Sequence, residues 1–221
     1  MQQVLILGCG KSGLAAAKLL AKRKESYLLY ADDANSYERL PQELTKFFVD
    51  KNKATSLLSN KEIKKIIVSP GIALEHPLVK KAKQLSIPTI SEIELALEDF
   101  RGEILAITGT NGKTTTTLMC QHILKKNALR ATCGGNIGIP VSNLLCKQPH
   151  PDILILELSS YQLEQIQTLS CKVSIVTNLS PDHLERHKTF INYALAKYKL
   201  ITFTEEESFC EQSFIETIKP L

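Results

Sequence analysis

The stretch that most constrains this chain is residues 104–117, which read ILAITGTNGKTTTT. Its first four residues form an apolar run typical of a buried strand, and a helical pattern begins at Lys113. Between them lies the turn Gly109–Gly112, whose glycines would let successive backbone N–H groups converge on an anion at the positive end of the helix. The stretch therefore predicts a phosphate-binding loop in a protein that handles ATP.

Side chains around this loop suit the same chemistry. Lys113 adds a mobile positive charge for the outer phosphates, and the Thr114 hydroxyl can reach a magnesium ion. The common phosphate-loop pattern has a glycine at the position of Ile107, so the match is to a shorter variant, TGTNGKTT. A strand-to-helix turn without a ligand is the alternative. The residues expected to contact the nucleotide are Gly109, Thr110, Asn111, Gly112, Lys113, Thr114 and Thr115.

A second glycine-rich turn lies near the N-terminus. The apolar run VLIL at 4–7 leads into Gly8–Gly13, which has the spacing G-x-G-x-x-G, and a helical stretch follows. A further apolar run at 27–31 is followed by Asp32, 19 residues after the last of these glycines. Read alone, this is a Rossmann-like dinucleotide fingerprint with the acidic residue on the ribose hydroxyls. The pattern does not identify the nucleotide, so an NAD-dependent oxidoreductase and a turn without a ligand stay open at this point.

Apolar runs alternate with helical patterns along most of the chain. Runs at 66–68 and 87–90 complete a small parallel sheet in the first part, and 92–100 reads as a helical link. The alternation then restarts with the phosphate loop. We therefore predict an α/β fold in which a Rossmann-like N-terminal domain at 1–92 is followed by a partial P-loop ATPase-type parallel-sheet domain at 93–221.

Two strands of the second domain would deliver polar residues to the same sheet edge. The runs at 152–158 and 173–177 are nearly continuous apolar segments, as expected of strands covered on both faces. Glu157 lies in the first run, and His183 follows the second. Because ligands collect at the C-terminal edge of an open parallel sheet, we expect Lys113, Glu157 and His183 to converge there.

Several of these polar residues also allow other interpretations. Glu157 in an apolar strand is costly unless it binds a cation or forms an ion pair, and the phosphate loop favours a magnesium ligand. His183 and His187 are four apart and invite a zinc interpretation, which the lack of a third ligand nearby in the sequence disfavours. Lys197 and Lys199 follow on a helical stretch, and from the residues alone both are expected at the surface.

Composition narrows the class of protein. Of 221 residues, 43% are hydrophobic and 23% charged, as in an ordinary globular protein, and the net charge of +4 is spread along the chain. We therefore interpret the run KEIKK at 61–65 as a solvated helix face and expect no nucleic-acid partner. Six cysteines without C-x-x-C spacing indicate reduced core residues. With no signal peptide and no apolar run long enough to span a bilayer, we expect a cytoplasmic protein without membrane contact.

The motifs taken together resemble the Mur ligases, the ATP-dependent amide-forming enzymes of peptidoglycan precursor synthesis. The motifs that match in order and spacing are TGTNGKTT at 108–115, GGNIG at 134–138, ELSSYQLE at 157–164 and NLSPDHLERH at 178–187. GCGKSGLAAA at 8–17 and SPGI at 69–72 are also similar to members of the family. The form of the ELSSYQLE motif most resembles the D-glutamate-adding members.

The resemblance implies a substrate and a reaction. The first domain would hold the UDP moiety of UDP-N-acetylmuramoyl-L-alanine, with Asp32 toward the uracil, and the second would bind ATP and Mg²⁺. ATP would phosphorylate the substrate carboxylate to an acyl phosphate, which the amine of D-glutamate would attack with release of phosphate. Such chemistry needs neutralisation of crowded oxyanions more than it needs a protein nucleophile.

The same resemblance assigns roles to individual residues. The family's magnesium ligands match Glu157 and His183, and its carbamylated lysine matches Lys197. Together with Thr114 these residues form the expected metal site, and together with Lys113 they form the expected catalytic set. The expected substrate-binding residues are Gly8, Gly10, Ser12, Gly13, Asp32, Ser69, Gly71, Asn136 and Ser159.

One departure from the family bears on activity. Family members have three domains, the last of which binds the incoming amino acid, whereas this chain ends at Leu221, inside the expected central domain. Beyond Thr202, the residues FTEEESFCEQSFIETIKPL lack the apolar strand expected next. We therefore expect a monomeric fragment, for which the alternative to ligation is binding of the UDP precursor and phosphate alone.

Overall fold

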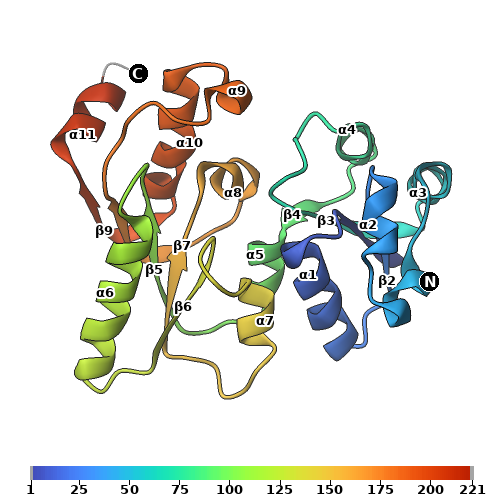
Figure 1. The fold of residues 1–221 in the computed structure, drawn as a ribbon, viewed down its shortest axis with the longest axis horizontal. Coiled ribbons are helices and arrows are strands. Elements are labelled where there is room, and N and C mark those ends of the chain that lie inside the picture. Colours follow the sequence, from blue (N-terminus) through green and yellow to red (C-terminus); the bar gives the residue numbers. More distant parts are fainter. Residues whose placement is uncertain (1, 220–221) are drawn as a thin grey trace. The chain divides into compact units, whose positions relative to one another are not determined.

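The computed structural model describes residues 2–219, which form two compact units (Figure 1). The first unit contains the chain through Asp99 together with Pro140–Gln148, and the second contains Phe100–Ile139 and the chain from Pro149 onward. Each unit is built on its own parallel sheet with helices packed against it, which confirms the predicted α/β fold class.

The first unit is built on a four-stranded parallel sheet with the strand order β2-β1-β3-β4. Its strands are β1 (Gln3–Leu7), β2 (Tyr27–Tyr30), β3 (Ile63–Val68) and β4 (Thr89–Ser91). Its helices are α1 (Lys11–Lys22), α2 (Ala34–Glu38), the 3-10 helix η1 (Gln42–Phe47), α3 (Lys51–Ser59), α4 (Pro77–Gln84), α5 (Glu92–Leu97) and α7 (Val141–Leu145). A helix separates each strand from the next along the chain, as parallel pairing requires.

Both faces of this sheet are covered, which explains why residues 4–7 of the internal strand β1 are all apolar. The side chains of residues 4–7 in β1 have no exposed surface. Leu5 and Leu7 belong to a core cluster with residues of α3 and α4, including Leu58 and Val79. Helices α1, α5 and α7 pack on one another against the other face (Figure 1).

The first unit extends beyond the predicted boundary at residue 92. α5 begins with a capping box formed by Ser91 and Glu94, and it packs on α1. α7 comes from later in the sequence but belongs to this unit, because the buried Glu92 carboxylate accepts the backbone N–H of Ser142 at 2.5 Å. The chain therefore passes between the units three times, at 99/100, 139/140 and 148/149. Periodicity along the sequence carries no signal of this arrangement.

The second unit is built on a five-stranded parallel sheet with the order β6-β7-β5-β8-β9. Its strands are β5 (Glu103–Thr108), β6 (Ala131–Gly135), β7 (Ile153–Glu157), β8 (Cys171–Val176) and β9 (Thr204–Cys210). Its helices are α6 (Lys113–Lys126), α8 (Ser160–Gln165), α9 (Leu184–His187), α10 (Phe190–Thr202) and α11 (Gln212–Ile218). α6 packs on β5, β6 and β7, whereas α10 packs on β5, β8 and β9 and contacts α8 and α11 (Figure 1).

β9 shows that a strand follows residue 202 although the sequence there has no apolar run. It pairs in parallel with β8, with Val173 opposite Glu207, although Glu205–Glu207 are all exposed. An apolar run is the signature of a strand covered on both faces, whereas β9 is the outermost strand of the sheet. Charged residues are tolerated at such an edge and oppose unwanted pairing with other chains. The residues beyond 202 thus lack an apolar strand, as the sequence indicated, and form a polar edge strand in its place.

Surface features depart from the sequence expectations in two places. The KEIKK segment at 61–65 enters strand β3 rather than a helix, and Lys64 and Lys65 form ion pairs with Glu25 and Glu98. All six cysteines are free, as predicted, but only Cys171 is buried and the other five are half-buried.

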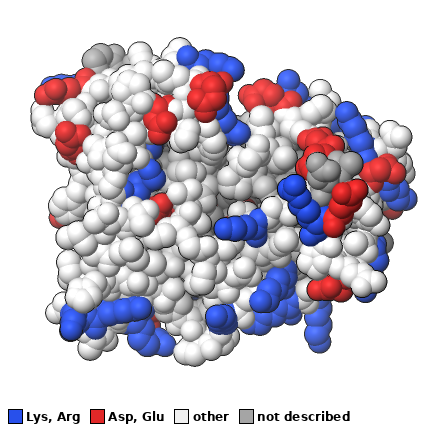
Figure 2. All heavy atoms as spheres, in the orientation of Figure 1, with Lys and Arg blue, Asp and Glu red and all other residues white. Residues whose placement is uncertain are grey.

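Figure 2 shows basic and acidic side chains interspersed on the face in view. Within residues 2–219, no helix combines the length and apolar character needed to cross a membrane.

Candidate functional site

The predicted phosphate-binding loop lies between β5 and α6, and its backbone requires glycine at two positions. Gly109 has φ +145°, and an added Cβ would lie 2.0 Å from the Thr177 hydroxyl. Gly112 has φ +79° and immediately precedes the first helical residue. No side chain of this N-cap residue satisfies the first N–H groups of α6, which leaves them available to an anion.

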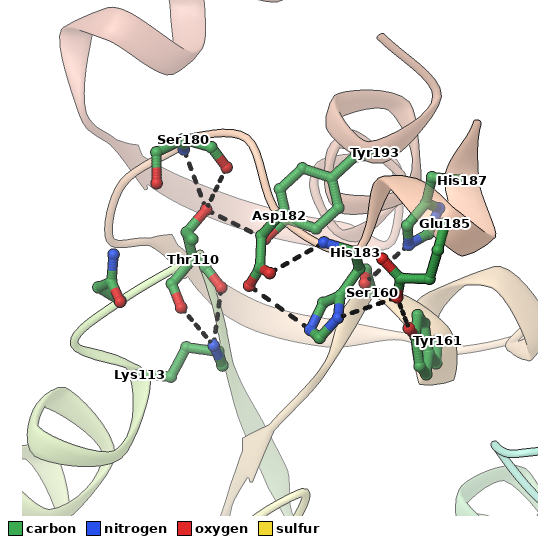
Figure 3. Close-up of polar contacts among 12 residues, drawn as sticks. Thr110, Lys113, Ser160, Tyr161, Ser180, Asp182, His183, Glu185, His187 and Tyr193 are labelled. Atoms are coloured by element: carbon green, nitrogen blue, oxygen red, sulfur yellow. Dashed lines mark hydrogen bonds and ion pairs between the residues drawn. The ribbon is translucent and has the colours of Figure 1, made fainter. Parts of the chain in front are cut away.

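A second loop, which follows β8, holds the phosphate loop in shape. Asn178 imitates a backbone partner: its Oδ1 accepts the N–H of Asn111 at 2.9 Å, and its Nδ2 donates to the Asn111 carbonyl at 2.9 Å. The Thr110 hydroxyl accepts the N–H of Ser180 at 3.0 Å and lies 3.0 Å from the Tyr193 hydroxyl (Figure 3). Asn178 was not among the predicted site residues, although its place two residues after the end of β8 was an available signal.

Two ammonium groups converge on one carbonyl oxygen of the phosphate loop. Lys113 Nζ donates to the carbonyls of Gly109 at 2.9 Å and Thr110 at 2.8 Å. Lys197 Nζ, from α10, donates to the same Gly109 carbonyl at 2.7 Å. None of the ion pairs within residues 2–219 involves either ammonium group. Neither ammonium group is therefore neutralised by a direct ion pair among these residues, although the Asp182 carboxylate acts on Lys197 at longer range.

Lys197 is not the surface residue that the sequence alone predicted. Its side chain is 1% exposed, and its ammonium group lies 4.6 Å from the ring centroid of Tyr193. Burial and the nearby charge of Lys113 lower the pKa of Lys197 to about 7, which leaves much of it unprotonated at neutral pH. The prediction was wrong because spacing along a helix does not show which of its sides packs over the phosphate loop, where Lys197 contacts the Gly109 carbonyl.

Glu157, at the end of β7, has its carboxylate held by two donors. Thr114 Oγ1 donates to one oxygen at 2.8 Å, and Asn136 Nδ2 donates to the other at 2.8 Å. Glu157 is 1% exposed, so its charge depends on such partners. A carboxylate and a hydroxyl beside a phosphate loop are oxygen ligands of the kind that Mg²⁺ prefers, so these residues fit that ion. Asn136, which the resemblance assigned to substrate, contacts Glu157.

His183 contacts acidic and aromatic side chains near α9. It precedes α9 with φ +53°, and its ring nitrogens lie 3.5 Å from the Asp182 carboxylate and 3.7 Å from that of Glu185 (Figure 3). Its ring centroid is 5.0 Å from that of Tyr161. Among the described residues, no hydrogen bond or ion pair joins His183 to another predicted metal ligand, and no three His, Cys, Asp or Glu side chains form a metal-binding group. Convergence of His183 with Glu157 at a metal ion therefore stays a prediction.

The start of α8 is fixed by hydrogen bonds within the protein. Ser159, predicted to bind substrate, caps α8 by accepting the N–H of Gln162 at 3.3 Å. Ser160 Oγ lies 2.9 Å from His187 Nε2, and His187 Nδ1 lies 2.9 Å from a Glu164 oxygen. Serine, imidazole and carboxylate in this order resemble an activated nucleophile. Ser160 is only 2% exposed, however, so the arrangement ties α9 to α8.

Removing the Ser160 hydroxyl is expected to destabilise the second unit. Ser160→Ala would leave the buried His187 Nε2 without its partner, at a cost of about 1–3 kcal/mol. Ser56→Ala, at an exposed position of α3, is the matched control and is expected to change stability by less than about 0.5 kcal/mol. Urea denaturation followed by circular dichroism measures both. Equal stability of the two variants would contradict this role for Ser160.

The N-terminal glycine turn opens into a pocket of about 490 Å³ in the first unit. Its lining comes from the turn before α1, the end of β2 and the loop after β3. The lining residues are Gly8–Ser12, Ala31–Asp33, Ser36 and Ser69–Ile72. α1 begins at Lys11 without a side-chain cap from Gly10, so its first N–H groups are available to an anion. Lys11, which the sequence analysis did not single out, adds positive charge to the same wall.

The glycines of this turn serve different purposes. Gly8 has φ +100°, and an added Cβ would lie 2.7 Å from the Ser69 hydroxyl. A Cβ on Gly13 would lie 1.8 Å from the Gly8 carbonyl oxygen, so Gly13 allows α1 to pack against the turn and does not line the pocket. A Cβ on Gly10 would meet nothing within 4 Å, although Gly10 lines the pocket.

Substitutions at Gly10 and Gly13 are therefore expected to have opposite effects. Gly13→Ala would destabilise the protein by about 1–3 kcal/mol, because backbone must move to admit the methyl group. Gly10→Val would leave stability within about 1 kcal/mol of the parent but fill the pocket, so it would weaken by about 10-fold or more any binding of UDP, the ligand that the sequence resemblance implies here. Thermal denaturation and calorimetric titration separate the two outcomes. If Gly10→Val binds UDP as tightly as the parent chain does, the ligand does not occupy this pocket.

Asp32, at the rim of this pocket, has its carboxylate held by two side chains. The Tyr30 hydroxyl donates to Asp32 Oδ1 at 2.7 Å, and His76 Nε2 lies 3.0 Å from Oδ2. The hydrogen bond from Tyr30, followed by that from His76, keeps the pKa of Asp32 below its usual range, although partial burial acts in the opposite direction. Asp32 is therefore an ionised acceptor that faces the pocket.

Two family models match successive parts of the chain. The Mur ligase MurD-like N-terminal domain matches residues 2–91, and the Mur ligase middle domain matches residues 107–214. The first match contains the pocket at the N-terminal glycine turn. The second contains the phosphate loop together with Glu157 and Lys197.

Individual relatives agree with the family models. The UDP-N-acetylmuramoylalanine–D-glutamate ligase of Oenococcus oeni is 39% identical over 199 residues, which are 90% of this chain and 43% of the relative. The ligase of the same name from Leptospira borgpetersenii is 43% identical over 198 residues, 90% of this chain and 41% of the relative. The chain thus spans less than half the length of the curated relatives that it matches.

Solved structures show the same fold at lower sequence identity. The UDP-N-acetylmuramate:L-alanyl-gamma-D-glutamyl-meso-diaminopimelate ligase of Neisseria meningitides superposes with a TM-score of 0.63 and 17% identity, over 100% of this chain and 75% of that one. The UDP-N-acetylmuramate-alanine ligase of Thermotoga maritima has a TM-score of 0.52 and 20% identity, over 97% of this chain and 50% of that one. These likenesses establish the fold alone.

Proposed function

Because this chain belongs to the Mur ligase family, of which it carries the MurD-like N-terminal and middle domains, we propose that it is part of a D-glutamate-adding ligase. In this proposal the first unit binds UDP-N-acetylmuramoyl-L-alanine and the second binds the phosphates of ATP, the nucleotide that the family uses. The names of the relatives support UDP-N-acetylmuramoylalanine and D-glutamate as the two substrates. The amide bond would form by attack of D-glutamate on an acyl phosphate.

The observation that carries the proposal is the convergence of Lys113 and Lys197 on the Gly109 carbonyl. Lys113 and the protonated form of Lys197 repel each other beside the N-terminus of α6, and an anion bound there would relieve this repulsion. The outer phosphates of ATP and the carboxylate that accepts the phosphoryl group are such anions. Transfer between two anionic groups depends on this neutralisation, so the site needs no protein nucleophile.

Glu157 and Thr114 would hold a magnesium ion, because their oxygens already lie 2.8 Å apart. When bound, this ion neutralises phosphate charge. Asn136 would keep the buried carboxylate oriented toward the site by donating to its other oxygen. His183 as a further ligand stays a prediction from the resemblance, since its ring contacts Asp182 and Glu185 in this structure.

Lys197 has the protonation that carbamylation would require. A neutral lysine amine adds CO₂ and loses one proton to give a carbamate anion, and burial with the charge of Lys113 lowers the pKa of Lys197 to about 7. The modification would replace one of two repelling cations by an anion able to bind the metal. Carbamylated Lys197 is therefore part of the proposal.

The pocket of the first unit would hold the UDP moiety. Unpartnered N–H groups at the start of α1 and the ammonium of Lys11 suit its diphosphate, and the Asp32 carboxylate suits a donor on the nucleoside. The match to a MurD-like N-terminal domain favours this substrate over the NAD alternative. The proposal includes a cytoplasmic monomer without nucleic-acid or membrane partners.

Release of phosphate from ATP by the purified chain tests the proposed reaction. The assay contains Mg²⁺ and UDP-N-acetylmuramoyl-L-alanine, with and without D-glutamate. Release that requires both substrates is the expected result for a working ligase. Binding of the UDP precursor without release would contradict ligation by this chain and leave the precursor-binding part of the proposal. Phosphate release at the same rate with and without the two substrates would contradict the proposed function altogether.

A further inference from the structure

The Asp32 carboxylate is oriented by a residue that lies outside the pocket. His76 directly precedes α4, and its Nε2 lies 3.0 Å and 3.2 Å from the two Asp32 oxygens. Neither His76 nor Tyr30 lines the pocket, whereas Asp32 does. Asp32 is about half exposed, but the His76 side chain retains only 10% of its exposure. The histidine therefore approaches Asp32 from behind the pocket wall.

The hydrogen bonds of His76 define its tautomer. Its Nδ1 accepts the backbone N–H of Leu78 at 3.2 Å, which caps α4. A nitrogen that accepts a hydrogen bond carries no proton, so the ring proton resides on Nε2. Nε2–H then donates to the Asp32 carboxylate. One side chain thus joins the start of α4 to the acidic residue at the end of β2.

Asp32 is left with acceptor capacity directed at the pocket. An ionised carboxylate has about four lone-pair sites, and the Tyr30 hydroxyl and His76 Nε2–H occupy about half of them. Because both donors belong to the protein, the remaining lone pairs are held in fixed directions. They can be satisfied by an N–H or O–H donor of a nucleoside, whereas phosphate oxygens have none to offer.

We infer that His76 is a positioning residue for nucleoside recognition: it holds the Asp32 carboxylate in the orientation that accepts a donor from the nucleoside of a bound diphosphate. The inference rests on the proposed function, since it takes the pocket to bind a uridine diphosphate. It adds a residue that no glycine motif contains and that does not touch the ligand. It also predicts a division of the pocket, in which His76 affects the nucleoside end and not the diphosphate end.

A matched pair of variants separates this role from capping of α4. His76→Asn retains a side-chain oxygen that can cap the helix but is too short to reach Asp32. Glu75→Ala, at the neighbouring exposed position, is the control. The expected result is that His76→Asn weakens UDP binding by about 10-fold while leaving pyrophosphate binding unchanged. Calorimetric titration of the whole chain with UDP and with pyrophosphate measures both.

A double-mutant cycle tests whether His76 acts through Asp32. In the Asp32→Ala background, adding His76→Asn is expected to cause no further loss of UDP affinity, because the carboxylate it would orient is absent. Independent losses that multiply would overturn the inference, as would equal weakening of UDP and pyrophosphate by His76→Asn. If the parent chain binds UDP but His76→Asn binds it equally well, only the inference fails. If the parent chain binds no UDP, the proposed function fails and the inference with it.

Discussion

Replacing Lys113 with alanine is expected to weaken ATP binding by on the order of 100-fold. Lys113 is the first residue of α6, and its ammonium group lies 2.8–2.9 Å from two carbonyls of the phosphate loop. In the proposed function this group binds the outer phosphates of ATP. Loss of this charge would remove a charge-assisted hydrogen bond to the nucleotide phosphates. Calorimetric titration with ATP and Mg²⁺ measures the change.

Lys125→Ala is the matched control for this substitution. Lys125 lies on the same helix, in its last turn, and is exposed. The control is expected to bind ATP as the parent chain does, which would exclude a general effect of net charge. Similar ATP affinities for the Lys113 and Lys125 variants would mean that the loop between β5 and α6 does not bind the nucleotide phosphates.

Lys197→Met is expected to remove a pH dependence from the stability of the chain. The folded-state pKa of Lys197 is about 7, below its ordinary value of 10.5, because of burial and the charge of Lys113. Between these values the unfolded chain binds a proton that the folded chain lacks, so stability rises with pH across this window. Below pH 7 both states are protonated and the full cost of burying the charge is present.

The size of this effect follows from the pKa difference. From pH 6.5 to 9.5, the parent chain is expected to gain on the order of 3 kcal/mol relative to Lys197→Met. Urea denaturation in CO₂-free buffer measures it, with Lys199→Met as the control. If the stabilities of the parent chain and of Lys197→Met change with pH in the same way, Lys197 is solvated rather than buried. Added bicarbonate is expected to stabilise the parent and not the variant, since carbamylation needs the amine.

The parts of the site that the sequence predicts are those carried by local patterns. Strand, glycine turn and helix follow one another within a few residues at both Gly8–Gly13 and Gly109–Gly112, so the turns could be placed without knowledge of the fold. Glu157 could also be found, because a carboxylate in an apolar strand needs a partner. In each case the physical requirement acts between sequence neighbours.

The parts that the sequence does not predict depend on contacts between distant residues. Lys197 is buried because α10 places it over the Gly109 carbonyl, and its own helix gives no sign of this. His76 lies 44 residues from Asp32, and neither belongs to a motif that includes the other. The assignment of α7 to the first unit depends likewise on the Glu92 carboxylate. Such contacts become visible only when the sheets are assembled.

Calorimetric titration of the chain with UDP-N-acetylmuramoyl-L-alanine, in parallel with NADH, would show which nucleotide the first unit binds. We expect saturable binding of the UDP precursor, and we expect Gly10→Val to weaken it because the diphosphate would lie at the glycine turn of the first unit. NADH is expected not to displace the precursor. Binding of NADH in preference to the UDP precursor would contradict the proposed substrate and indicate that the first unit binds a dinucleotide cofactor.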